Sequence, residues 1–114
     1  MSVVIWHNPR CSKSRQTLAL LEEAGHAPEV RLYLKDGPSA AEVDALQAAL
    51  GLPLSAMMRV KDAAFKEAGL NAESAEADLR AALLANPVLL ERPIVVVGEK
   101  AAIGRPPEQV LTLF

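Results

Sequence analysis

The first 34 residues contain two β-type segments separated by a helical one, and this order constrains the fold more than any other feature. Residues 3–6 form a short apolar run without alternation, which is typical of a strand buried on both faces. A helix is expected over residues 12–24, with Gly25 as its stop. Residues 29–34 then alternate as a second strand would, and the order predicts a parallel βαβ unit.

Helices are expected in the middle of the chain. Ser39 and Glu42 have the spacing of a capping box, which predicts that a helix begins there. Residues 54–85 are rich in alanine and helical in character, and Gly69 and Asn71 divide them into at least two helices.

The C-terminal third predicts a hairpin and a closing helix. Residues 94–97 and 101–103 are the expected strands, and Pro106-Pro107 opens the helix. The order βαβ, helices, ββα fits an α/β domain in which helices pack on a small sheet. It matches a thioredoxin-like (glutaredoxin-like) fold, with a four-stranded mixed sheet and a central helical insertion. We expect residues 1–114 to form a single domain.

The composition excludes several functional classes. A formal net charge of -2 argues against a dedicated nucleic-acid-binding protein. No apolar run approaches the roughly 20 residues of a membrane span, and no signal peptide is visible, so we expect a cytoplasmic protein without a membrane partner. The single cysteine excludes an internal disulfide, and the two histidines lack ligand spacing. No metal and no tightly bound cofactor are therefore expected.

Cys11 lies in the connection between the first strand and the first helix, where open α/β sheets bind ligands. The free N–H groups and dipole of a helix N-terminus favour a thiolate, and neighbouring cations lower the pKa of a cysteine. Arg10, Lys13 and Arg15 surround it, and no acidic residue occurs over residues 7–16. The pattern predicts a reactive thiol in an anion-binding site, against the alternative of an inert buried thiol.

The spacing after this cysteine limits its chemistry. Cys11 and Ser14 form a C-x-x-S pattern, so a resolving thiol has to come from another molecule. Thr17 stands where the C-x5-R loop of a tyrosine phosphatase would place its arginine, which argues against that class.

Three segments carry a further signal, namely residues 5–15 (IWHNPRCSKSR), 91–96 (ERPIVV) and 103–108 (IGRPPE). A middle segment that ends in Met57-Met58-Arg59 accompanies them. In this order they resemble the glutaredoxin-coupled arsenate reductases of the ArsC family over nearly the whole chain. The resemblance implies a thioredoxin-like fold with a helical insertion and one nucleophilic cysteine.

The resemblance also implies roles for single residues. Cys11 is similar to the nucleophile, and Arg59, Arg92 and Arg105 are similar to three arginines that hold the oxyanion. Guanidinium groups suit this task because their forked donors match oxyanion geometry and stay charged. Each arginine also has a simpler interpretation as a surface or strand-end charge. Pro93 is similar to the cis-proline that faces the active cysteine in thioredoxin-like folds.

The remaining loop residues are expected to support the site. Ser14, Arg15 and Lys13 are candidates for substrate binding, and Ser14 can donate to the sulfur or to an oxyanion. Asn8 is expected to organise the loop by hydrogen bonds. His7 is similar to the histidine that precedes the nucleophile in the family, and it either tunes the thiolate or caps the loop.

The function implied is reduction of arsenate, or a similar oxyanion, through an adduct on Cys11, with glutathione as co-substrate and glutaredoxin as partner. Two alternatives remain open. One is a glutathione-linked thiol oxidoreductase without specificity for arsenate. The other is a non-catalytic adaptor that binds a protein partner, as the regulator Spx of the same superfamily does.

Overall fold

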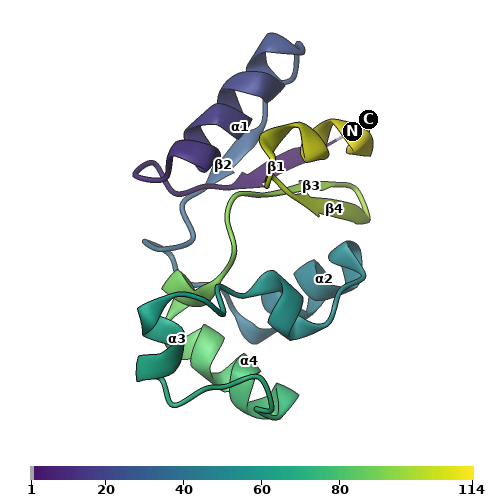
Figure 1. Ribbon diagram of the computed structural model, residues 1–114. Helices are drawn as coiled ribbons and strands as arrows, with labels where there is room; N and C mark the ends of the chain where they lie inside the picture. Colours follow the sequence, from purple (N-terminus) through teal and green to yellow (C-terminus); the bar gives the residue numbers. More distant parts are fainter. Residues whose placement is uncertain (1) are drawn as a thin grey trace. The chain divides into compact units, whose positions relative to one another are not determined.

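The computed structural model describes residues 2–114, which form two compact units (Figure 1). Unit 1 contains the chain up to Asp36 and again from Arg92 to Phe114, and unit 2 contains Gly37–Glu91. The single-domain organisation expected from the sequence stays a prediction.

Unit 1 is built on a four-stranded mixed sheet in the order β2-β1-β3-β4. Its strands are β1 (Val3–Trp6), β2 (Glu29–Arg31), β3 (Ile94–Val97) and β4 (Lys100–Ile103). β1 pairs parallel with β2 and antiparallel with β3, and β3 pairs antiparallel with β4. The sequence prediction of a parallel βαβ unit followed by a hairpin is therefore confirmed. This sheet, with a helical unit inserted between β2 and β3, is a thioredoxin-like fold.

Two helices cover one face of this sheet, as Figure 1 shows. Helix α1 (Ser12–Glu23) spans the predicted residues and is followed by Gly25, whose φ of 90° only glycine adopts easily. The closing helix is a 3-10 helix, η3 (Pro107–Leu113), in which residues three apart line up on one face. Pro107 and Val110 are accordingly both buried. The core under these helices consists of Ile5, Leu21, Val95, Val97 and Val110.

The second strand is shorter than the alternation predicts. The chain turns after Arg31, and Val30, Leu32 and Leu34 are 43%, 36% and 41% exposed. Tyr33 is instead fully buried, with its ring centroid 6.1 Å from that of Trp6. Packing between two large aromatic rings buries more apolar area than the aliphatic side chains would.

Unit 2 is helical, as the sequence predicts. Its elements are α2 (Ala40–Leu50), η1 (Leu54–Met57), α3 (Ala63–Glu67), α4 (Glu76–Ala85) and η2 (Pro87–Leu89). The capping box is present, because the Glu42 N–H donates to Ser39 Oγ and the Ser39 N–H donates to Glu42 Oε1. No helix formed by residues 2–114 is long and apolar enough to cross a membrane.

Gly104, which directly follows β4, is closely packed against Thr17 and Pro93. Its N–H donates to the Pro93 carbonyl at 2.8 Å. A Cβ atom at this position would lie 2.6 Å from Thr17 Oγ1 and 2.8 Å from Pro93 Cγ, closer than van der Waals contact permits. The site therefore requires glycine for space.

We expect Gly104→Ala to destabilise the protein by about 1–3 kcal/mol, the range typical of overpacking. Urea unfolding followed by circular dichroism would measure the change. Gly37→Ala is the matched control, because a Cβ there meets nothing nearer than Pro87 Cγ at 4.0 Å. Equal stability of the two variants would contradict the close packing.

Candidate active site

Cys11 is the N-cap residue of α1, at the carboxyl end of β1, where the sequence predicts it. A turn held by Asn8 places it there. The Cys11 N–H donates to the Asn8 carbonyl at 3.0 Å, and the Arg10 N–H donates to Asn8 Oδ1 at 3.0 Å. Asn8 thus holds this turn through both its backbone and its side chain.

The sulfur of Cys11 is partly exposed and is stabilised as a thiolate. Burial raises the pKa of this thiol, but several donors together outweigh the burial. They are the backbone N–H of Ser14, the side chain of Arg92 and the backbone N–H of Lys13, and the charge of Arg92 adds to them. The net result is a pKa below the ordinary value for cysteine, which makes the thiol more nucleophilic near neutral pH.

Arg92 and Arg105 both face the sulfur, although they are far from it in the sequence. Arg105 Nη2 donates to Cys11 Sγ at 3.6 Å, and Arg105 Nε donates to the Arg92 carbonyl at 2.8 Å. The register of the hairpin explains the pairing, because Ile94 on β3 lies opposite Ile103 on β4. Arg92 precedes Ile94 by two residues and Arg105 follows Ile103 by two residues, so both arginines lie at the same end of the hairpin. The structure therefore brings together three of the predicted catalytic residues.

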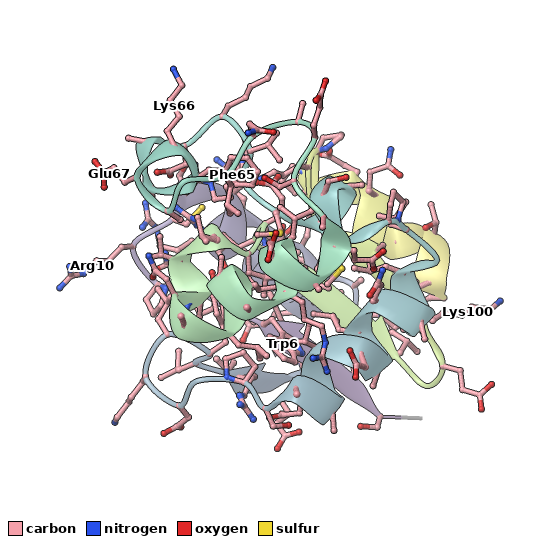
Figure 2. The ribbon with its side chains drawn as sticks, turned by 90° about the horizontal axis from the view of Figure 1, so that it is seen from below. Trp6, Arg10, Phe65, Lys66, Glu67 and Lys100 are labelled. Carbon is pink, nitrogen blue, oxygen red and sulfur yellow. The ribbon has the colours of Figure 1, made fainter. Side chains whose placement is uncertain are left out.

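The cations next to Cys11 in the sequence act less directly than expected. Arg10 is exposed, and its side chain extends away from the protein (Figure 2). Arg15 Nη1 donates to the Pro9 carbonyl at 2.8 Å. The charge that lowers the pKa of Cys11 comes from Arg92, and Lys13 contributes through its backbone N–H. The expected roles of Lys13 and Arg15 in substrate binding stay predictions.

His7 and Ser14 form a buried pair behind the loop. His7 Nδ1 and Ser14 Oγ are joined by a hydrogen bond of 2.6 Å, and the Asn8 N–H donates to Ser14 Oγ at 3.0 Å. Burial lowers the pKa of His7, and the charge of Arg15 lowers it further, which favours the neutral imidazole. This geometry agrees with the loop-capping interpretation of His7. The Ser14 hydroxyl holds the loop, while its N–H faces the sulfur.

Arg59 belongs to unit 2 and follows η1 in a loop, whereas the sequence suggested a helical position. The helix ends at Met57 because the next residues pair with another segment, through a bridge between Met58 and Leu90. The Arg59 guanidinium lies 3.6 Å from Asp62 Oδ2 and 3.7 Å from Glu91 Oε1. Its expected role in holding an oxyanion stays a prediction.

Two X–Pro bonds in unit 1 are cis. The Arg92–Pro93 bond is cis, as the resemblance implies for Pro93. The Arg105–Pro106 bond is also cis, which was not predicted from the sequence.

Two further residues near the site, Thr17 and Gly104, were not predicted from the sequence to support it. Thr17 is fully buried and its hydroxyl donates to the Lys13 carbonyl at 2.8 Å, within the first turns of α1. Gly104 leaves no room for a side chain beside Thr17 and directly precedes Arg105. The sequence signal that could have identified Gly104 was a glycine directly before Arg105-Pro106, at a position where no turn was predicted.

Among residues 2–114 no cluster of three or more histidine, cysteine, aspartate or glutamate side chains could hold a metal ion. The chemistry of the described residues is that of an activated thiol beside two guanidinium groups. Such a site can bind an anion and attack it.

Comparisons with protein families, known sequences and solved structures all point to the same family. Residues 6–113 match the sequence profile of the ArsC family. The chain is 48% identical to an arsenate reductase of Haemophilus influenzae over the full length of both proteins. It is 49% identical to an arsenate reductase of Neisseria meningitidis, over 95% of this chain and 94% of that protein. The solved structure of an arsenate reductase from Vibrio cholerae superposes with a TM-score of 0.95 at 52% identity, covering 100% of this chain and 98% of that one.

We expect iodoacetamide to alkylate Cys11 with a midpoint below the pH at which an ordinary thiol reacts, because the folded protein lowers the pKa of this thiol. Arg92→Ala should move the midpoint to higher pH, since it removes both a donor and a positive charge from the sulfur. The rate of alkylation, followed by mass spectrometry across a range of pH, would give the midpoint for each protein.

Arg80→Ala is the control for this experiment. Arg80 is an exposed arginine of unit 2 paired with Asp44 at 2.9 Å, and its removal should leave the midpoint unchanged. An equal shift in both variants would show that Arg92 has no specific effect on the thiolate.

Proposed function

The chain belongs to the ArsC family, and we propose that it reduces arsenate to arsenite by nucleophilic attack of the Cys11 thiolate. The observation that carries this proposal is the position of the sulfur. It lies at the N-terminus of α1, with the Arg92 and Arg105 side chains directed at it. The names of the relatives at 48% and 49% identity support the same substrate.

The two arginines suit an anionic substrate. Arsenate carries between one and two negative charges near neutral pH, so a thiolate that attacks it meets electrostatic repulsion. Guanidinium groups offset this repulsion and present paired donors to the oxygens. They also stabilise charge on the oxygen that leaves. We assign Arg92 and Arg105 to this role.

The first step forms a bond between the Cys11 sulfur and arsenic. One arsenate oxygen accepts protons and leaves as water, and arsenic stays in its pentavalent state. In the second step a glutathione thiolate attacks the Cys11 sulfur. The sulfur–arsenic electron pair passes to arsenic, which leaves as trivalent arsenite, and a Cys11–glutathione disulfide remains. Lys13 and Arg15 are assigned to substrate binding beside these groups.

The reductant has to be external, because Cys11 is the only cysteine of the chain. A glutaredoxin thiol would attack the mixed disulfide, release the Cys11 thiolate and carry away the glutathione. This cycle uses glutathione as a co-substrate and needs no tightly bound cofactor. It also requires a reducing compartment, so we propose a cytoplasmic location.

A second candidate function uses the same thiolate without arsenic. A partly exposed, activated cysteine without an internal partner is also suited to exchange with glutathione mixed disulfides. This candidate predicts turnover of a glutathionylated peptide that depends little on Arg92.

We expect arsenate-dependent oxidation of NADPH in the presence of glutathione, glutaredoxin and glutathione reductase, and no activity in Cys11→Ser. Arg92→Ala should lower kcat/KM for arsenate by about 100-fold, the loss typical of removing one donor to a charged transition state. Arg80→Ala should retain full activity, because Arg80 pairs with Asp44 in unit 2.

Activity that survives in Cys11→Ser would contradict the mechanism. Turnover of a glutathionylated peptide at equal rates in the wild type and Arg92→Ala, without arsenate reduction, would favour the second candidate.

A further inference from the structure

Positive charge is concentrated around the active-site loop of a chain whose net charge is -2. The first acidic residue of the chain is Glu22, and the first turn of α1 contains none. We define the cationic rim as Arg10, Lys13 and Arg15. It adds to Arg92 and Arg105, which face the sulfur itself.

Arg10 is the member of this rim that the proposed chemistry leaves unused. Its backbone is fixed beside the nucleophile, because its N–H donates to Asn8 Oδ1 in the turn that holds Cys11. Its side chain is exposed and reaches into solvent (Figure 2). Arg15 is also exposed, but its guanidinium group donates to the Pro9 carbonyl. Arg10 therefore offers a charge to molecules that approach the thiol.

We propose that the cationic rim, and Arg10 above all, attracts a net-negative small thiol or disulfide of the glutathione type to Cys11. The inference rests on the proposed function only in its need for an external thiol. Glutathione carries two carboxylates and one ammonium group, so its net charge near neutral pH is negative. A cation beside the reacting sulfur raises the local concentration of such a molecule and its rate of encounter.

Lys100 provides a matched position for testing this idea. It is exposed at the start of β4 and lies opposite Val97, which pairs with Val3 at the start of β1. The loop of Cys11 follows the other end of β1, so the two cations occupy opposite ends of the sheet of unit 1. Figure 2 shows Arg10 and Lys100 projecting from opposite sides. Charge reversal at either position changes the net charge equally, but only Arg10 lies near the thiol.

The experiment compares Arg10→Glu with Lys100→Glu in thiol–disulfide exchange, without arsenate. The Cys11 thiolate attacks one sulfur of a disulfide, a mixed disulfide forms, and the leaving thiolate takes a proton from water. Three disulfides serve as probes: glutathione disulfide, which is anionic, 2-hydroxyethyl disulfide, which is neutral, and cystamine, which is cationic. The rate of loss of the Cys11 thiol is followed by mass spectrometry at low ionic strength and in 0.5 M salt, where the screening length is only about 4 Å.

In Arg10→Glu the rate with glutathione disulfide, relative to the neutral disulfide, should fall by about 5-fold at low ionic strength. The relative rate with cystamine should rise, and both effects should largely disappear in high salt. The neutral disulfide corrects for any change in the reactivity of Cys11 itself, and Lys100→Glu should change the ratios by less than about 1.5-fold.

The inference would be overturned if the rate with glutathione disulfide, relative to the neutral disulfide, were the same in Arg10→Glu and Lys100→Glu. So would an equal fall in the rates with all three disulfides, because it would show that the substitution acts on the Cys11 thiol itself and not on the charge of the approaching disulfide. The proposed function is tested separately by arsenate reduction, so a protein inactive toward arsenate can still show or lack this charge preference.

Discussion

The hydrogen bonds between the first turn of α1 and the sulfur of Cys11 are the interaction on which the site depends. They stabilise negative charge at one atom, and the N–H groups of Lys13 and Ser14 supply them. They exist only if the helix begins directly after the cysteine. The Asn8 turn and the buried His7–Ser14 pair secure that start, so polar residues with no direct role in the chemistry support the nucleophile.

The second requirement is positive charge from a distant part of the chain. Two guanidinium groups repel each other, and their proximity has a cost in free energy. The hydrogen bond from Arg105 to the Arg92 carbonyl and the negative charge of the thiolate offset part of that cost. The site is therefore arranged so that an anion, or the thiolate itself, is needed to balance its charge. That property suits a tetrahedral oxyanion as substrate.

Much of the fold follows from local patterns. The βαβ unit, the capping box at Ser39 and the hairpin were each predicted from a few neighbouring residues, because periodicity and turn chemistry act over short distances. The second strand shows where this approach fails. The alternation predicted a strand over residues 29–34, but the strand ends at Arg31, and Tyr33 packs against Trp6, more than 20 residues earlier in the chain.

The site shows the same division between local and distant information. The sequence by itself determined that one cysteine would sit at a helix N-terminus, because the strand, the turn and the helix are contiguous. It also named Arg92 and Arg105, through the family resemblance. Only the tertiary structure decided which cations act on the sulfur, since the register of β3 and β4 brings distant arginines to it while the neighbouring Arg10 extends into solvent. A side chain's direction depends on the surfaces that pack around it, and those surfaces come from all parts of the chain.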